Sequence, residues 1–381
     1  MTNILSAELS TGTITVEVER SAVPPDELFG FAERHNPKRS FLFVSKVLGR
    51  HVPATPAAMN AGYRALASAL PPDLPGPVLV TGMAETAIGI GAGVHRELAA
   101  GRDDVVYLCT TRHRMAAPVL CEFLEEHSHA TDQTVHWPVD PATRALVRDA
   151  RTLVMVDDEA STGKTFANLH RALVAAGLGH IEKVFLVTLT DWSGGRAAEA
   201  IGPGTESVAL LSGRYSWTPR PGAEPPRMRP VPAPRALPPQ APRQDLDWGR
   251  LGVTRHEGYL DAGDIRGERV LVVGTGEHVW QPFLLAERLE RAGNEVRVSA
   301  VTRSPIADGH AIASGIAFSD NYGIGVTNFL YNVDPAAYDR IVLCIETGEG
   351  TVDPVLLGWL GRTRLHLLSD LDVAGTSALS A

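Results

Sequence analysis

The chain contains little cysteine, and this scarcity argues against two classes of site. Only three cysteines occur among 381 residues, namely Cys109, Cys121 and Cys344. They form no CxxC pair and no cluster with histidine, so neither a disulfide framework nor a zinc centre is predicted. Cys109 and Cys344 lie in apolar runs that are typical of buried strands, and packing in the core is the role expected of both.

A long apolar run and an excess of positive charge are also missing. No run approaches the roughly 20 residues that a membrane span requires. Residues 1–20 have neither the basic region nor the apolar region of a signal peptide. The net charge of −9 does not favour non-specific attraction to nucleic acid or to an anionic membrane. We therefore expect a cytoplasmic enzyme or binding protein with neither of these partners.

Proline is concentrated in one segment, which divides the chain. Residues 218–244 hold ten of the 27 prolines. Because proline fixes φ and removes a backbone donor, this segment is predicted to be an extended connector. Either a solvated tether or a linker docked along one domain fits this composition. We predict a first domain over residues 1–217, a linker over 218–247 and a second domain over 248–381.

Short apolar runs alternate with helical patterns on both sides of the linker. Such alternation predicts parallel sheets that are covered by helices on both faces. Both domains are therefore predicted to be α/β, and the second is predicted to be Rossmann-like. The predicted strands are residues 77–80, 105–109, 153–156, 183–189, 269–273, 295–300 and 340–345, and the predicted helices are residues 84–100, 165–176 and 280–291.

The stretch VMVDDEASTGKT, from Val154 to Thr165, ends like the P-loop of an ATPase. A P-loop requires a glycine five residues before its Gly-Lys pair. That position holds Asp158, whose carboxylate repels phosphate and resists the required backbone conformation. An ATPase is therefore not favoured. ATP hydrolysis that is abolished by Lys164→Ala would restore that hypothesis.

The same stretch has the features of a ribose 5-phosphate site. An apolar strand ends in Asp157 and Asp158, and Ser161 to Thr165 then open a helix. The free N–H groups and the dipole of a helix N-terminus bind phosphate. Two carboxylates one turn earlier can accept hydrogen bonds from a vicinal diol. An acidic strand end that merely caps a helix is the structural alternative.

This arrangement resembles the PRPP-binding motif of the type I phosphoribosyltransferases. The resemblance implies their fold, with Asp157 and Asp158 on the ribose hydroxyls and with the 5-phosphate on a six-residue loop. Lys164 matches the purine-salvage enzymes, but Ser161 stands where those enzymes have an aspartate, and Glu159 replaces an apolar residue. A purine acceptor is therefore not implied. The predicted phosphate loop consists of Ala160, Ser161, Thr162, Gly163, Lys164 and Thr165.

The resemblance also implies a second loop that binds pyrophosphate and a mobile loop that carries a cation. The first matches the turn after residues 77–80, and the second matches the turn after residues 105–109. Arg112 is the expected catalytic cation, and Arg114 is expected to contact pyrophosphate. Exposed loop arginines and a plain strand-to-helix turn are the alternatives. The residues expected to bind pyrophosphate are Gly82, Met83, Ala84, Glu85 and Thr86. The basic and apolar segment of residues 36–51 is a candidate hood over the acceptor.

In the second domain, candidate ligand loops follow the predicted strands 269–273, 295–300 and 340–345, the last of them with the sequence CIETG at residues 344–348, at the sheet edge where α/β folds bind ligands. The turn after residues 269–273 carries a lone GxG, which is weak evidence for a dinucleotide because Val279 stands in place of the third glycine. The tetrapeptide TRSP follows residues 295–300, and a polar loop, DNYG, lies at residues 320–323. The ligand candidates are Gly274, Thr275, Gly276, Thr302, Arg303 and Ser304.

TRSP in this position makes the chain similar to the family in which a phosphoribosyltransferase domain precedes a TRSP domain. That family occurs in tellurite-resistance and stress gene neighbourhoods. The resemblance implies nucleotide-like biosynthesis from PRPP and a small-molecule acceptor. It also implies Mg²⁺ held through PRPP rather than by direct protein ligands, and a homodimer is common among type I enzymes. Neither the acceptor nor the type of glycosidic bond follows from the sequence.

A non-catalytic regulatory protein that senses PRPP or a nucleotide is the second hypothesis. Sensors keep the phosphate loop but can lose the cation of the mobile loop. Arg112 and Arg114 favour an enzyme. Release of pyrophosphate, as opposed to binding without turnover, distinguishes the two hypotheses.

Overall fold

The computed structural model describes residues 3–36, 39–124 and 132–373. Its centre is a seven-stranded sheet with the order β1-β2-β11-β10-β9-β5-β6. The five strands β11 to β6 run parallel, and β1 and β2 add an antiparallel edge. The strands are β1 (Asn3–Leu9), β2 (Gly12–Ser21), β5 (Val78–Gly82), β6 (Val105–Cys109), β9 (Thr152–Ala160), β10 (Lys183–Asp191) and β11 (Thr205–Pro219).

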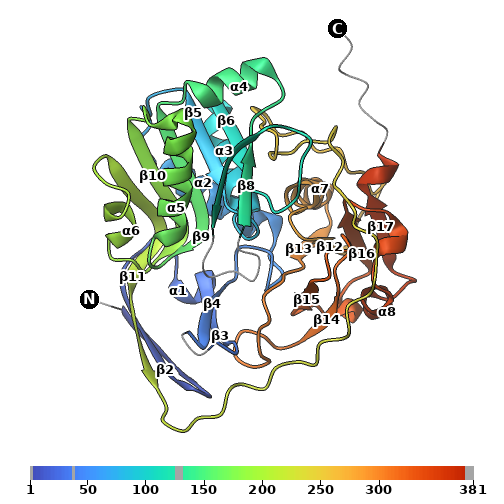
Figure 1. The fold of residues 1–381 in the computed structure, drawn as a ribbon. Helices are drawn as coiled ribbons and strands as arrows, with labels where there is room; N and C mark the ends of the chain where they lie inside the picture. Colours follow the sequence, from blue (N-terminus) through green and yellow to red (C-terminus); the bar gives the residue numbers. More distant parts are fainter. Residues whose placement is uncertain (1–2, 37–38, 125–131, 374–381) are drawn as a thin grey trace.

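Helices cover the faces of this sheet because the parallel strands are apolar throughout. The four residues 153–156 of β9 are fully buried, as are all five residues of β6. Figure 1 shows α5 in front of the sheet and α2 and α3 on the other side. The main helices are α2 (Pro56–Ser68), α3 (Ile88–Leu98), α4 (Pro141–Arg148) and α5 (Lys164–Leu173), with the short helices α1 (Pro25–Leu28) and α6 (Arg196–Glu199). The fold is that of a type I phosphoribosyltransferase, as the sequence predicts.

Two antiparallel hairpins stand apart from the sheet. One pairs β3 (Phe29–Glu33) with β4 (Phe41–Ser45), and the other pairs β7 (Val119–Leu124) with β8 (Asp132–His136). The β3–β4 hairpin falls partly in the segment predicted as a hood. It packs its aromatic residues against Trp192, Tyr215 and Trp217.

The second domain has its own parallel sheet, with the order β13-β12-β16-β17. An antiparallel pair, β14 and β15, and the helices α7 and α8 complete it (Figure 1). Helix α7 packs on β12 and β13, and its buried residues Trp280 and Phe283 contact Tyr63 of α2 in the first domain. The elements are β12 (Arg269–Gly274), α7 (Trp280–Arg291), β13 (Glu295–Ala300), β14 (Gly315–Ser319), β15 (Thr327–Tyr331), β16 (Arg340–Ile345), α8 (Pro354–Leu360) and β17 (Leu365–Ser369).

The proline-rich segment has no helix or strand after Pro219 and runs around the outside of the second domain (Figure 1). Arg235 donates to the carbonyl of Val352 at 3.0 Å, and the amide of Gln240 donates to the carbonyl of Tyr322 at 2.7 Å. Of the two alternatives, a solvated tether and a docked linker, the structure has the docked one.

Each domain adds a short segment to the sheet edge of the other. Val253 pairs with Tyr107 on the edge strand β6, and the amide of Cys109 donates to the carbonyl of Gly249 at 2.8 Å. In the opposite direction, Ala54 of the first domain pairs with Val298 on the edge strand β13. These pairings join the domains through backbone hydrogen bonds as well as side-chain packing.

No helix among the described residues is long and apolar enough to cross a membrane.

Candidate functional site

Strand β9 lies in the middle of the sheet and carries Asp157 and Asp158 near its carboxyl end. Both side chains are half-buried. The Thr86 hydroxyl donates to Asp158 Oδ1 at 3.1 Å, and the Asp158 amide donates to Asp157 Oδ1 at 2.9 Å. The structure therefore brings together two regions predicted separately, the acidic pair and the candidate pyrophosphate loop.

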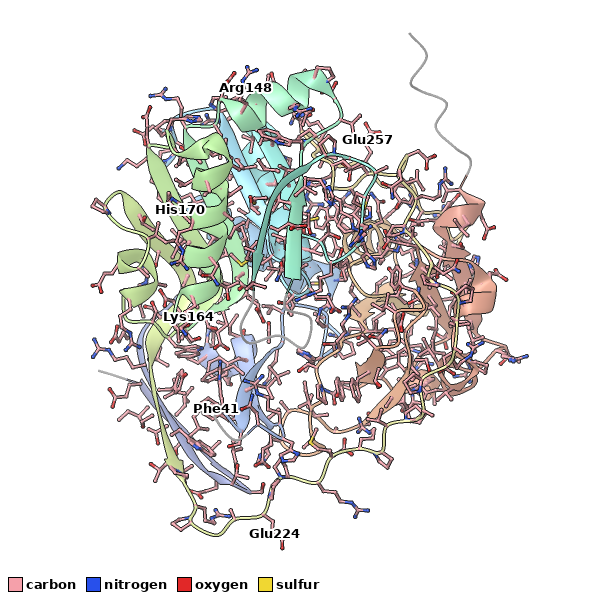
Figure 2. The ribbon with its side chains drawn as sticks, viewed as in Figure 1. Phe41, Arg148, Lys164, His170, Glu224 and Glu257 are labelled. Atoms are coloured by element: carbon pink, nitrogen blue, oxygen red, sulfur yellow. The ribbon has the colours of Figure 1, made fainter. Side chains whose placement is uncertain are left out.

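The loop after β9 turns sharply into α5 at Gly163. Its φ is +73°, and a Cβ there would lie 2.5 Å from the Cα of Ala197, so only glycine fits. Figure 2 shows Lys164 in the first turn of α5, at the opposite end of the domain from Arg148. Among the described residues, none accepts a hydrogen bond from the amide of Thr162, Gly163 or Thr165. Amides without protein acceptors at the N-terminus of a helix are suited to bind an anion.

The loop between β5 and α3 is only partly free to bind a ligand. The amide of Met83 donates to Val156 O at 3.1 Å, and that of Ala84 donates to the Thr110 hydroxyl at 2.7 Å. The amides of Glu85 and Thr86 donate to no residue in the described part of the chain. Of the residues predicted to bind pyrophosphate, Glu85 and Thr86 therefore have the available backbone donors.

Residues after β6 contact the second domain. The amide of Arg112 donates to Glu277 Oε1 at 2.7 Å, and the Thr111 hydroxyl donates to Glu277 Oε2 at 2.6 Å. The Arg112 side chain is half-buried, and Arg114 is exposed. Residues 125–131, which join β7 to β8, lie outside the described residues.

A buried charge network crosses the domain interface next to this loop. Arg250 donates to Glu277 at 3.1 Å and to both oxygens of Glu346 at 2.6 and 2.9 Å, and all three side chains are at most 2% exposed. The Tyr322 hydroxyl donates to Glu346 at 2.7 Å. The loops after β12 and β16 that carry the two carboxylates flank the point where the strand order of this sheet reverses. Arg250 fills that crevice, where open α/β sheets bind ligands.

The charges of this network shift the pKa values of its own carboxyls. Burial alone would raise the pKa of Glu277, but the nearby His113 and Arg250 and the donors of the loop after β6 lower it to about 2. Burial would likewise raise the pKa of Glu346, and Arg250 and His278 lower it to about 2. Both carboxylates are therefore ionised at neutral pH.

The ligand candidates of the second domain lie at strand ends that face the first domain. The Thr275 hydroxyl donates to Cys344 O at 3.2 Å, and the carbonyl of Gly276 accepts from Arg50 at 3.4 Å. A Cβ on Gly274 would lie only 2.3 Å from His278 O, so the turn has no space for a side chain at this position. Thr302 accepts from the Ser304 amide at 3.2 Å. Arg303 is directed toward Glu85, with 3.6 Å between Nε and Oε2.

The hood is held by a second ion pair. Arg39 donates to Glu159 at 2.6 Å, and its guanidinium lies 5.2 Å from the ring centre of Phe41. Glu159, the acid that replaces an apolar residue in the motif, thus binds the hairpin over the site. Neither this pair nor Arg50, Arg250, Glu277 and Glu346 was predicted from the sequence. The one sequence feature that could have indicated any of these residues is a charged residue in a loop after a predicted strand. Of the residues named, only Glu277 and Glu346 have this feature.

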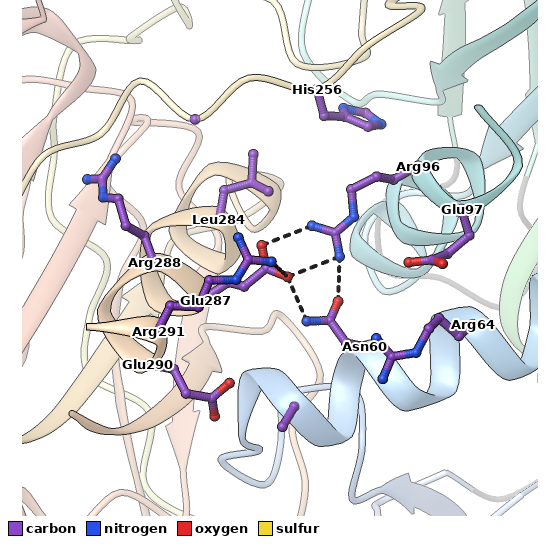
Figure 3. Close-up of a pocket in the computed structure, with 12 residues that line it drawn as sticks. Asn60, Arg64, Arg96, Glu97, His256, Leu284, Glu287, Arg288, Glu290 and Arg291 are labelled. Atoms are coloured by element: carbon purple, nitrogen blue, oxygen red, sulfur yellow. Dashed lines mark hydrogen bonds and ion pairs between the residues drawn. The ribbon is translucent and has the colours of Figure 1, made fainter. Parts of the chain in front are cut away.

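A cleft of the described residues lies away from the acidic pair and the charge network. It has a volume of about 690 Å³ and is lined by α2, α3 and α7 (Figure 3). Arg96 crosses it to contact Glu287 at 3.1 Å and also donates to Asn60. The last turns of α3 and α7 form its wall, and these turns lie at the amino ends of the strands. The cleft therefore opens at the edge opposite the acidic pair.

Within the described residues, no group of three or more His, Cys, Asp and Glu side chains is placed to hold a metal ion.

Comparison with protein families gives two matches. Residues 28–214 match the phosphoribosyl transferase model, and residues 252–357 match the TRSP domain that lies C-terminal to that transferase. No curated protein matches the chain.

Solved structures that match include adenine phosphoribosyltransferases from three organisms. The Rhodothermus marinus enzyme is 16% identical, with 49% of this chain and 94% of that chain covered and a TM-score of 0.34. The Giardia lamblia enzyme, complexed with 9-deazaadenine, is 20% identical, with 50% and 97% covered and a TM-score of 0.35. The Trypanosoma brucei enzyme, in complex with AMP, pyrophosphate and ribose-5-phosphate, is 12% identical, with 48% and 77% covered and a TM-score of 0.34.

Proposed function

Because the chain belongs to the family in which a phosphoribosyl transferase domain is followed by a TRSP domain, we propose that it transfers ribose 5-phosphate from PRPP to a nucleobase-like small molecule and releases pyrophosphate. The observation that carries this proposal is the position of Asp157 and Asp158 between two sets of available amides. One set belongs to Thr162, Gly163 and Thr165, and the other belongs to Glu85 and Thr86.

Each part of PRPP has a matching part of the site. The 5-phosphate binds the amides of Thr162, Gly163 and Thr165 at the start of α5. The ribose hydroxyls donate to the carboxylates of Asp157 and Asp158. The diphosphate binds the amides of Glu85 and Thr86. The hydrogen bond from Thr86 to Asp158 fixes the position of the diphosphate loop relative to the acidic pair that binds the diol.

In the reaction, the bond between C1 of the ribose and the diphosphate oxygen breaks, and pyrophosphate leaves with the electron pair. The acceptor atom forms the new bond to C1 from the opposite face and gives up its proton. Positive charge develops on the ribose ring as the old bond lengthens. Asp157 and Asp158 stabilise that charge, because fixed carboxylates in a half-buried site need no reorganisation.

The residues of the site also fit Mg²⁺ bound through PRPP. Mg²⁺ prefers oxygen ligands and keeps several waters, so the phosphate oxygens of PRPP would hold it without a direct protein ligand. Asp157 and Asp158, which we place on the ribose hydroxyls, are half-buried carboxylates that would favour a cation on the bound ligand. When bound, the ion would neutralise part of the diphosphate charge and make pyrophosphate a better leaving group.

The test is calorimetric titration with Mg²⁺-PRPP, followed by an assay of pyrophosphate release with a panel of nucleobases. We expect the double variant Asp157→Asn/Asp158→Asn to lose binding and turnover while it keeps the thermal stability of the wild type. Asp149→Asn is the matched control, because Asp149 is an exposed carboxylate that pairs with Arg148 at the other end of the domain.

Wild-type turnover in the double variant would refute the assignment of the diol site. PRPP binding with no pyrophosphate release from any acceptor would favour a regulatory protein over an enzyme.

A further inference from the structure

The carboxyl edges of the two parallel sheets face each other across the domain interface. Glu277, after β12, holds the loop that follows β6. Residues after β13 contact the β3–β4 hairpin, which carries part of the hood: the amide of Ala307 donates to Glu33 O at 2.8 Å. Loops of the second domain therefore contact the mobile-loop region and the hood of the transferase site. Two arginines form a third contact, between the second domain and the candidate pyrophosphate loop.

The first of these arginines, Arg50, is fully engaged by protein groups. Its Nη1 donates to Glu85 Oε1 at 2.6 Å and to Val301 O at 2.7 Å, and its Nη2 donates to Glu85 O at 3.0 Å and to Gly276 O at 3.4 Å. Its side chain is 2% exposed. Arg50 therefore neutralises Glu85 and fixes the loop to the second domain, with little capacity left for a ligand.

The second arginine, Arg303, is placed differently. Its side chain is 11% exposed, and among the described residues its one ion pair is the 3.6 Å contact with Glu85. That distance is too long for a hydrogen bond. Arg303 donates no hydrogen bond to any residue that the structure describes. A guanidinium has five N–H donors in a planar fork, and those of Arg303 can therefore bind the oxygens of a ligand.

The charge of Arg303 also acts on the loop after β6. Burial lowers the pKa of His113 in that loop, and the positive charge of Arg303 is among the smaller influences in the same direction. The guanidinium lies beside Glu85, in the loop that the proposed function assigns to pyrophosphate. Since Arg50 already balances the charge of Glu85, the charge of Arg303 remains available to a ligand.

We propose that Arg303 binds the diphosphate of PRPP, so that the second domain supplies part of the donor site. This inference rests on the proposed function. An entering diphosphate takes the hydrogen bonds that Arg303 does not make to protein, and the long ion pair to Glu85 gives way to short bonds with phosphate oxygens. Guanidinium groups suit this role because they bind phosphate with two parallel hydrogen bonds. The same group then stabilises pyrophosphate as it leaves.

The experiment compares three ligands on the full chain: Mg²⁺-PRPP, Mg²⁺-pyrophosphate and ribose 5-phosphate, which has no diphosphate. Arg303→Ala is expected to weaken the binding of PRPP and pyrophosphate by about ten- to a hundredfold, as the loss of charge-assisted hydrogen bonds predicts. Binding of ribose 5-phosphate is expected to stay unchanged. Arg303→Lys, which keeps the charge but not the fork, should fall between Arg303→Ala and the wild type.

Arg340→Ala is the matched control. Arg340 belongs to the same sheet but lies at the first residue of β16, at the opposite edge, where it pairs with Glu268. Its removal should leave all three affinities as in the wild type.

If Arg303→Ala binds pyrophosphate and PRPP as tightly as the wild type, Arg303 only balances the charge of Glu85, and the inference is wrong although the proposed function stands. Equal weakening of all three ligands would mean a general distortion of the site and would also overturn it. A wild-type protein that binds no PRPP would overturn the proposed function and this assignment together.

Discussion

Replacement of Arg250 by methionine tests the buried ion network of the second domain that lies at the interface with the first. Arg250 comes from the segment that follows the linker, and its partners Glu277 and Glu346 belong to the second sheet. All three side chains are almost completely excluded from solvent. Arg250→Met keeps the long apolar part of the side chain and removes the charge. The two carboxylates then remain buried without their shared cation.

The expected cost is about 3–5 kcal/mol in the free energy of unfolding, which is the usual loss when one partner of a buried ion pair is removed. The upper part of this range applies here, because one cation serves two carboxylates. Tyr322 still donates to Glu346, and Thr111 still donates to Glu277, so neither carboxylate loses all its donors. Domains are stable by about 5–15 kcal/mol, so this loss is a large fraction of the total.

The measurement is urea unfolding followed by tryptophan fluorescence. The variant should lose stability, and it should show two transitions if the domains unfold separately. The triple variant Arg250→Met/Glu277→Gln/Glu346→Gln should recover most of the loss, because amides of the same shape carry no charge. A loss below about 1 kcal/mol in the free energy of unfolding of Arg250→Met would refute the reasoning, since breaking a buried ion pair is expected to cost about 3–5 kcal/mol.

The dependence on pH gives an independent check of the same prediction. In the wild type, the pKa values of Glu277 and Glu346 are lowered to about 2, below the usual value near 4.3 in an unfolded chain. Their contribution is therefore complete above about pH 4.3 and is lost as the pH falls toward 2. Without Arg250, burial raises these pKa values, so the folded variant takes up protons more readily than the unfolded chain. The stability difference between variant and wild type should shrink as the pH falls from 7 to 5.

Three further predictions concern the donor loop and a buried histidine. Gly163→Ala should weaken PRPP binding by about 1–3 kcal/mol in calorimetry, because alanine strains a backbone with φ of +73° and collides with Ala197; unchanged affinity would contradict the placement of the phosphate at these amides. Thr162→Val should cost about 1.5–3 kcal/mol of PRPP affinity, the value of a hydrogen bond to a charged group, whereas wild-type affinity would place the phosphate elsewhere. Burial lowers the pKa of His51 to about 3, so the folded state loses stability as the pH falls below about 6.5. In urea unfolding between pH 6 and 4, His51→Asn should therefore reduce the dependence of the unfolding free energy on pH by about 1.4 kcal/mol per pH unit. An unchanged slope would show that His51 does not carry this effect.

Local patterns in the sequence predict the centres of the two sheets and the phosphate loop. Helix α7, β13 and β16 have the predicted bounds, because apolar runs and helical periodicity are local signals. Strand β9 continues past Val156 to Ala160, since its acidic end still pairs with β10. Apolar runs do not reveal β1 and β2, whose buried residues alternate with more exposed ones.

The helix predicted over residues 84–100 is shorter at both ends, because residues 83–87 form the loop that bonds with Thr110 and Val156. The partners of Arg250 lie 27 and 96 residues away along the chain, and nothing near Arg250 marks it as buried. The same holds for Arg50, which contacts residues of both domains. Such contacts depend on how the domains meet, and a pattern within one segment carries no information about that.

The exchange of short strands between the domains limits how this protein can be divided. A fragment that ends at residue 217 would leave β6 without the pairing from Gly249 and Val253, and a fragment that begins at residue 248 would leave β13 without Ala54. An uncovered strand edge is a template for pairing with another chain and therefore for aggregation. Expression of the two halves as separate chains would thus expose one unpaired strand edge on each fragment.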